Sequence, residues 1–326
     1  MLLKPEIFKL KEGIKSVFGV PKKNTLCTNS LDNALTLMTL DGQKIKYSIL
    51  AKDFTDYISE GTFIYFPVFS TELIAYVQKR VFHIYDMTKN EYRGHLICET
   101  FPESIVSAEV VGNKTFFLKI RQFSENPANM GADPDYILKK YEIDFRNARL
   151  IKQKMLKEHE REFVNGKNIF ICDRKAIAVY DLDFGVVEHP IAGLFDKDKT
   201  SAELLVYELV AHPILPFAIM VSKDNVYLIE WRKEVHGFPV FPSNSESYEF
   251  SPDQNWLIYW QFDDEEKKLY AMKVNPESKT FFDLPVFLGA FQKIPDKNSR
   301  TWMPDPMSYV IIDKGKQELV VWKFEK

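Results

Sequence analysis

The densest group of potential metal ligands in the sequence is the acidic run Asp263-Asp264-Glu265-Glu266. A calcium site needs several oxygen ligands that converge at about 2.3–2.6 Å from one ion. Four consecutive acids at the tip of a hairpin cannot all point inward, and the chain contains no Asp-x-Asp-x-Asp-Gly pattern. The run therefore predicts a solvated acidic turn, and the sequence predicts no metal site.

Residue types used in catalysis are present, but without the spacing that catalytic motifs require. The six histidines stand at positions 83, 95, 159, 189, 212 and 236, and none belongs to a His-Glu-x-x-His pair. The chain also lacks the Gly-x-Ser-x-Gly turn of hydrolases and the Gly-rich loops that bind nucleotides. We therefore predict no catalytic residue and no cofactor. An enzyme that gathers single residues from distant segments stays open, because spacing alone cannot show such convergence.

One long connection and two basic pairs are the strongest candidates for a binding surface. Residues 122–135 join two apolar runs, and long loops on a rigid scaffold often carry binding residues. The alternative for every one of these segments is ordinary solvated surface. The predicted partner-binding residues are Lys79, Arg80, Phe123, Met130, Asp133, Asp135, Arg174, Lys175, Asp263 and Asp264.

The charge balance limits the class of partner. The chain has 43 Lys and Arg against 46 Asp and Glu, a formal net charge of −3. Binding to nucleic acid or to an acidic membrane surface favours a strongly basic face. We therefore predict a protein or peptide partner, with no nucleic acid and no membrane. The most apolar stretch, residues 203–221, contains Glu208, Pro213 and Pro216, which argue against a membrane span.

The cysteines and the N-terminus point to a reducing compartment. Cys27, Cys98 and Cys172 are odd in number and widely spaced, which argues against a disulfide framework and against a cysteine zinc site. Each lies in an apolar run, so we expect buried free thiols. The first residues lack the apolar core and cleavage site of a signal peptide. The predicted location is the cytoplasm.

Short strands must position all of these residues, because one strand-turn-strand unit recurs along the whole chain. Its clearest copy is residues 175–182, followed by the turn Asp183-Phe184-Gly185. The copies end at Leu40, Met87, Ile143, Leu182, Trp231, Val274 and Phe324. Their mean spacing of about 47 residues is typical of a four-stranded propeller blade, and radial stacking of such blades buries both faces of every sheet. Seven copies predict an all-β, seven-bladed β-propeller.

Short motifs give this repeat a family resemblance. Ile84-Tyr85-Asp86-Met87 and Val179-Tyr180-Asp181-Leu182 resemble the end of the third strand in WD40 repeats. Residues 250–259, with Ser251-Pro252-Asp253, resemble the turn that leads from the first strand to the second. The chain is therefore similar to a divergent WD40-like propeller. No repeat begins with the Gly-His dipeptide of that family, so we do not expect its His–Asp hydrogen-bond network.

We expect one propeller domain over residues 1–326. Its blades fall at roughly 14–50, 61–98, 104–156, 161–192, 203–242, 246–289 and 299–326. The last blade has only three strands, so residues 1–11 are expected to add the closing strand and remove an open edge. Residues 146–161 are open between strand and helix, because positions 148, 151 and 155 have helical spacing. We expect a strand.

These patterns favour a non-enzymatic protein- or peptide-binding scaffold that uses the propeller face carrying the 122–135 insertion. The alternative is a propeller enzyme of the hydrolase or lactonase type, metal-dependent or not, with its site in the central channel. A structural part of a larger assembly is a third reading.

Overall fold

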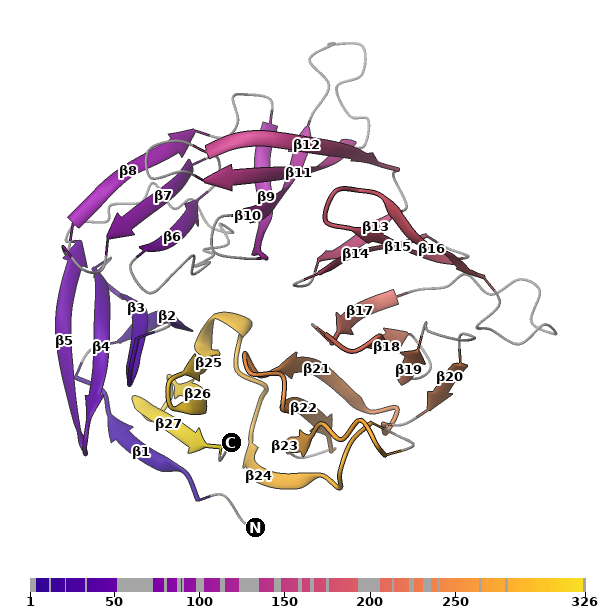
Figure 1. Ribbon diagram of the computed structural model, residues 1–326. Helices are drawn as coiled ribbons and strands as arrows, with labels where there is room; N and C mark the ends of the chain where they lie inside the picture. Colours follow the sequence, from indigo (N-terminus) through magenta and orange to yellow (C-terminus); the bar gives the residue numbers. More distant parts are fainter. Residues whose placement is uncertain are drawn as a thin grey trace.

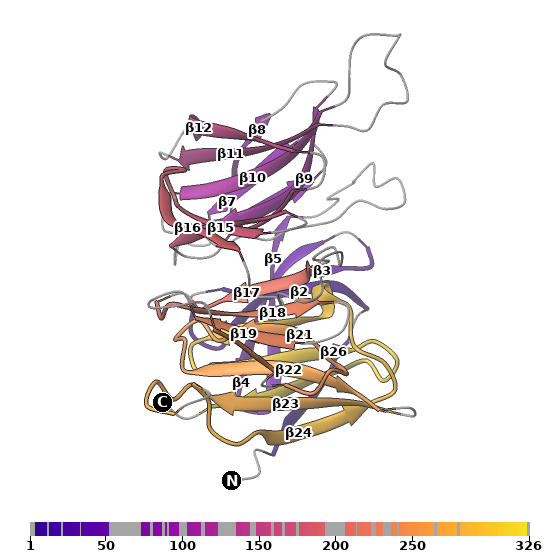
Figure 2. The same cartoon turned by 90° about the vertical axis from the view of Figure 1, so that its right-hand side faces the viewer.

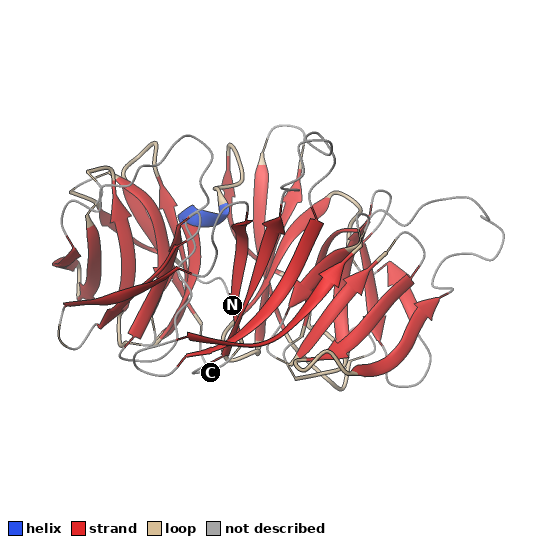
Figure 3. Ribbon diagram, turned by 90° about the horizontal axis from the view of Figure 1, so that it is seen from above, coloured by secondary structure: helices blue, strands red, loops and turns tan. Residues whose placement is uncertain are grey.

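The computed structural model describes most of the chain. The described residues are 4–11, 13–20, 22–32, 34–51, 73–78, 81–86, 89, 91–97, 103–111, 115–122, 135–143, 148–157, 160–164, 167–173, 176–192, 206–212, 214–222, 226–230, 236–239, 241–263, 266–278 and 281–324. Within them the only helix is a single 3-10 turn, η2 (Lys297–Ser299), and all other regular structure is β-strand (Figure 3). No helix in this part of the chain is long and apolar enough to cross a membrane.

The described strands form seven antiparallel sheets, six of four strands and one of three. Each sheet is one blade, numbered in chain order. Blades 1 to 3 contain β2 (Ile14–Gly19), β3 (Thr25–Ser30), β4 (Leu35–Asp41) and β5 (Lys44–Ala51); β6 (Leu73–Gln78), β7 (Val81–Asp86) and β8 (Glu91–Ile97); and β9 (Glu103–Val110), β10 (Thr115–Gln122), β11 (Asp135–Ile143) and β12 (Ala148–Leu156).

The remaining blades repeat the same meander. Blades 4 to 7 contain β13 (Arg161–Val164), β14 (Asn168–Cys172), β15 (Ala176–Asp181) and β16 (Val186–Ala192); β17 (Val206–Ala211), β18 (Phe217–Ser222), β19 (Val226–Glu230) and β20 (His236–Pro239); β21 (Ser245–Phe250), β22 (Trp256–Phe262), β23 (Lys267–Lys273) and β24 (Val286–Phe291); and β25 (Arg300–Pro304), β26 (Met307–Asp313), β27 (Glu318–Lys323) and β1 (Glu6–Lys9).

The blades are arranged radially around one axis (Figure 1), and the sheets of blades 5 and 6 stack one against the next in the side view (Figure 2). The first strand of a blade lies nearest the axis and the last strand lies outermost, as β17 and β20 illustrate. This is the predicted seven-bladed all-β fold. The first strand expected for blade 2, at residues 63–69, lies outside the described residues.

Shared apolar clusters hold consecutive blades together. Blades 3 and 4 share Leu138 and Ile171, blades 5 and 6 share Phe217 and Leu257, and comparable clusters join blades 4 to 5 and 6 to 7. Three of the five tryptophans, at positions 260, 302 and 322, are buried in the cluster between blades 6 and 7. Radial stacking thus buries both faces of these sheets, which is why such blades fold together.

The N-terminal strand closes the ring, as predicted from the incomplete last blade. β1 pairs antiparallel with β27, with Ile7 opposite Val320. Ion pairs join the two strands at both ends, Lys9 Nζ to Glu318 Oε1 at 2.5 Å and Lys323 Nζ to Glu6 Oε1 at 2.6 Å. Phe8 then points into the cluster that blades 7 and 1 share. Pairing the two ends of the chain covers the edge of β27, which would otherwise be the unpaired outer edge of the last blade.

Two details of the strand assignments follow from pairing. Residues 148–156 form β12, whose register with β11 shifts between Lys140 and Tyr141, so the strand interpretation of this segment is confirmed and the helical one is wrong. The fourth strand of blade 6 begins at Val286, and the isolated bridge between Val274 and Phe282 precedes it. Cys27 and Cys172 are buried free thiols, as expected.

Candidate functional site

Two of the predicted binding residues lie in the described part of the chain, on the same edge of their blades. Asp135 is exposed at the start of β11, opposite Gln122 at the end of β10. Asp263 is exposed after β22, where its Oδ2 accepts a hydrogen bond from Lys268 Nζ at 2.6 Å. The others, Lys79, Arg80, Phe123, Met130, Asp133, Arg174, Lys175 and Asp264, lie outside the described residues.

The same edge is where the inner strands begin. Gln122, which precedes the insertion, pairs with Glu103, the first residue of β9. Gln261 in blade 6 likewise pairs with Ser245, the first residue of β21. The insertion-bearing face of the propeller is therefore also the face at which the chain enters each of these inner strands.

A cavity of about 1000 Å³ lies among the inner strands of blades 3 to 7. It is lined mainly by β9, β13, β17, β21 and β25 and by the segment around η2, and it also reaches residues of β10, β11, β14 and β18. The five inner strands surround the axis in Figure 1. The wall combines aromatic side chains with an unusual number of charges. The charged residues are Glu109, Glu162, Glu208, Glu246, Glu249, Lys119, Lys297 and Arg300.

Two of the five glutamates have a cationic partner inside the protein. Glu162 Oε2 accepts a hydrogen bond from Lys119 Nζ at 2.6 Å, yet desolvation still raises the pKa of this carboxyl because burial outweighs the lysine. Glu249 Oε1 lies 3.1 Å from Arg300 Nε in an ion pair that lacks hydrogen-bond alignment. Both cations are thus already committed to a carboxylate.

The other three glutamates, at positions 109, 208 and 246, form no ion pair with any described residue. Desolvation raises the pKa of Glu208 to about 7, although its Oε2 accepts a hydrogen bond from the Ser247 N–H at 2.9 Å. Desolvation also raises the pKa of Glu109, against the opposing field of Lys297, and that of Glu246, against Arg300. The cavity wall therefore holds carboxyl groups whose charge is only partly compensated.

The backbone of blade 6 makes the contact to Glu208 possible. Ser247 has a φ of 58°, in the left-handed region, and the register of β21 with β22 shifts between Glu246 and Glu249. Such a bulge turns residues of an inner strand away from the ladder. The Ser247 N–H is thereby free to reach across to blade 5.

Hydrogen-bond donors without acceptors lie in the same wall. Arg300 and Trp302 are 7% and 8% exposed and both line the cavity. Arg300 Nη1 and Trp302 Nε1 have no hydrogen-bond partner among the described residues, and neither has Trp260 Nε1 behind them. These donor atoms have almost no accessible surface, so they lie behind the surface of the cavity wall and a molecule in the cavity does not reach them.

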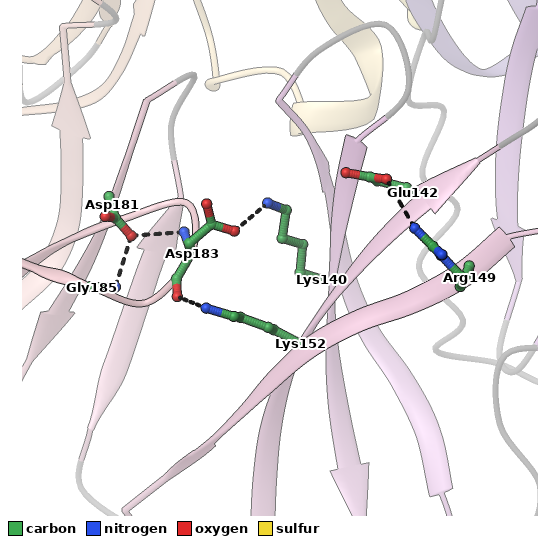
Figure 4. Close-up of polar contacts among 7 residues, drawn as sticks. All are labelled: Lys140, Glu142, Arg149, Lys152, Asp181, Asp183 and Gly185. Carbon is green, nitrogen blue, oxygen red and sulfur yellow. Dashed lines mark hydrogen bonds and ion pairs between the residues drawn. The ribbon is translucent and has the colours of Figure 1, made fainter.

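An ion-pair clamp joins blades 3 and 4, two walls of the cavity (Figure 4). Lys140 Nζ donates to Asp183 Oδ1 at 2.8 Å, and Lys152 Nζ donates to the Asp183 carbonyl oxygen at 3.0 Å. Asp181 Oδ1 fixes the turn by accepting from the N–H groups of Asp183 and Gly185. The hydrogen bond from Lys140 lowers the pKa of Asp183. This clamp is structural, and none of its residues lines the cavity.

The cavity glutamates carry a signal in the sequence that motif spacing misses. In four consecutive blades the inner strand contains a glutamate followed by a hydrophobic residue: Glu109-Val110, Glu162-Phe163, Glu208-Leu209 and Glu249-Phe250. An alignment of first strands, rather than of strand ends, finds this recurrence. No group of three His, Cys, Asp or Glu side chains in the described part of the chain has the geometry to hold a metal ion.

Comparison with known proteins establishes the class of fold. No protein-family model and no curated protein sequence matches the chain. Solved structures do match, among them the crystal structure of Saccharomyces cerevisiae Sqt1, a WD40 protein, with a TM-score of 0.53 and 10% sequence identity over the full length of both chains. The chain thus has the fold of a WD40-like β-propeller, as the Tyr-Asp and Ser-Pro-Asp motifs predicted, and at this identity the similarity shows the fold alone.

Proposed function

We propose that the protein is a non-enzymatic scaffold whose insertion-bearing face binds a protein or peptide, with a segment of the partner entering the axial cavity. The observation that carries the proposal is the cavity itself, about 1000 Å³ in volume and open among five inner strands. Cavities of this size are typical of binding sites. Tyr207, 54% exposed on β17, is a suitable aromatic contact.

Several further features support this assignment. WD40-type architecture places loops from every blade around one rigid mouth, which suits recognition of an extended segment. The net charge of −3 favours protein or peptide partners over nucleic acid and membranes. The buried free thiols Cys27 and Cys172 are consistent with a reducing compartment such as the cytoplasm. We also propose that residues 1–326 form one propeller domain.

The test is affinity capture from native lysate with matched variants. One variant replaces residues 123–134 by a short Gly-Ser linker, and a second is Tyr207→Ala in the cavity wall. The control is Leu284→Ala, which removes a side chain that is 87% exposed and not part of the cavity. We expect the first two variants to lose captured proteins that the control retains. Equal capture by all three variants would contradict the choice of face.

A propeller enzyme of the hydrolase or lactonase type is the second candidate. It is favoured by Glu208, whose pKa of about 7 leaves the carboxyl partly protonated at neutral pH, as a general acid or base requires. The discriminating measurement is turnover of a panel of lactones and esters by the wild type and by Glu208→Gln. Turnover that disappears in this variant would replace the scaffold assignment, whereas an inactive wild type leaves the scaffold preferred.

A further inference from the structure

The partly compensated charge of the cavity defines the chemistry of its ligand. Five glutamates face three cationic side chains, and two of those cations, Lys119 and Arg300, already lie against Glu162 and Glu249. Lys297, the third, is exposed on η2. Of the glutamates without an ion pair, Glu208 and Glu246 are half-buried and Glu109 is exposed. A cation from outside offsets the desolvation that the protein's own cations leave uncompensated.

We propose that the cavity binds a peptide segment through a lysine or arginine side chain, whose cationic head lies beside Glu208 and Glu246. This inference rests on the scaffold function proposed above and names the chemistry of the partner. β17 and β21, which carry Glu208 and Glu246, are neighbours at the axis, and the bond from Ser247 to Glu208 joins them (Figure 1). Desolvation is the largest cause of the raised pKa of both carboxyls, and Arg300 offsets it only in part.

The size of the cavity distinguishes a peptide from a bare cation. Its volume of about 1000 Å³ is more than one small cation fills. No group of three His, Cys, Asp or Glu side chains in the described residues could hold a metal ion. A peptide fills the remaining space with its backbone and with the side chains next to the cationic one.

Aromatic side chains complete the match. Tyr207 is exposed to the cavity, and Phe250 and Trp302 line the wall near it. The methylene stem of a lysine or arginine packs well on aromatic surface while its head remains with the carboxylates. A glutamine of similar length would fill the space without satisfying the charge.

The experiment uses the full chain and a defined peptide library. The probes are N-acetylated, C-amidated peptides of about nine residues, random except for a central Lys, Arg, Gln or Glu, and the readout is enrichment on the immobilised protein. We expect the Lys and Arg pools to exceed the Gln pool about tenfold, a ratio equivalent to one well-formed buried charge contact. The preference is expected to fall as salt rises from about 0.05 to about 0.5 M.

Paired variants test which carboxylates are responsible. The double variant Glu208→Gln, Glu246→Gln is expected to remove most of the preference for Lys and Arg. The control is Glu142→Gln, which removes the same charge from an exposed carboxylate on β11 that lies beside Arg149 (Figure 4). It is expected to retain the preference. Thermal melting of each variant checks that the fold is kept.

The outcomes separate this inference from the scaffold proposal. Equal enrichment of the Gln and Lys pools, lost in Tyr207→Ala, overturns the cationic ligand while the scaffold function stands. Unchanged preference in the double variant also overturns it. If no pool binds, the cationic ligand is overturned as well, and the scaffold proposal is then decided separately by whether Tyr207→Ala loses partners in the lysate capture.

Discussion

Glu208 in blade 5 and Ser247 in blade 6 are joined by a hydrogen bond of 2.9 Å from the backbone N–H of the serine to the carboxylate. The bond crosses from one inner strand to the next at the wall of the axial cavity. It is the strongest polar contact of a carboxyl that otherwise lacks a cation, and it does not offset the desolvation. Stability at this position therefore depends on pH.

The first prediction concerns the variant Glu208→Gln. The folded-state pKa of about 7 is raised from an ordinary value of 4.5, so the folded protein holds the proton more tightly than the unfolded chain. The stability that the protonated Glu208 carboxyl contributes is complete below pH 4.5 and is lost as the pH rises through 7. Because glutamine stays neutral, the variant should be more stable than the wild type at pH 8, by about 1–3 kcal/mol, and nearly equal at pH 4.5. Melting curves at the two pH values measure this, with Glu142→Gln as the control; an equal effect at both would contradict it.

The second prediction concerns His212, which links the turns of blades 5 and 6. Its Nδ1 accepts hydrogen bonds from the N–H groups of Ile214 and Leu215, at 3.1 and 2.9 Å, and Nε2 lies 3.1 Å from the carbonyl oxygen of Gln254. Since Nδ1 accepts, the proton is on Nε2 and the ring is neutral. Desolvation lowers the pKa of His212 from 6.5.

His212→Ala should therefore cost about 1–3 kcal/mol at pH 7.5, through lost packing and unpaired backbone donors. The stability that neutral His212 contributes is present above pH 6.5 and is lost as the pH falls toward the lower folded-state pKa. The difference in unfolding free energy between variant and wild type should therefore shrink at pH 5.5. Denaturant melts at the two pH values measure it. Ile214→Ala, at an exposed neighbour, should show no such pH dependence.

The third prediction concerns the close approach of blade 1 to blade 7. The Gly19 N–H donates to Thr301 Oγ1 at 3.0 Å, and a Cβ at Gly19 would lie 1.8 Å from the Trp302 carbonyl oxygen. Gly19→Ala therefore forces two backbones apart and should destabilise the protein by about 1–3 kcal/mol or more. Gly315→Ala is the matched control, because its nearest contact would be 3.4 Å away. Similar melting temperatures for the two variants would show that the blades separate at little cost.

The fourth prediction tests closure of the ring. Deleting residues 1–11 removes β1 and should lower the melting temperature strongly, because it exposes the edge of β27 and part of the shared core. A finer comparison uses neighbours in the strand. Phe8 is 5% exposed, so Phe8→Ala should lower the free energy of unfolding by about 2–4 kcal/mol. Ile7 is 58% exposed, so Ile7→Ala should lower it by less than about 0.5 kcal/mol. An unchanged melt after the deletion would mean that the ring closes elsewhere.

Much of the fold was predictable because the strand pattern is local. The alternation of apolar residues over 319–324 predicted a strand, and the last blade lacked a fourth strand to pair with it. Residues 6–9 supply that strand. The segment 148–156 was ambiguous because its apolar residues suit both periods, and only pairing with β11 decides for a strand.

The candidate site was much less predictable. Attention to hairpin tips singled out Asp135 and Asp263, which lie at the edge where the inner strands begin, but it did not find the cavity. Its glutamates look like ordinary strand residues, because a charged residue on an inner strand can point either to the axis or between blades. Whether Lys119 or Arg300 offsets the charge of a glutamate depends on contacts between strands that are distant in sequence.

By itself the sequence determined the repeat, the number of blades and the closure by the chain ends, because each follows from short-range alternation and from the need to bury both faces of a sheet. Tertiary structure alone decided which carboxylates share a cavity and which have a cation beside them. The reason is that desolvation and Coulomb interactions act through space between blades. A glutamate on one strand can therefore have a cation beside it, while a glutamate at a similar position on the next strand has none.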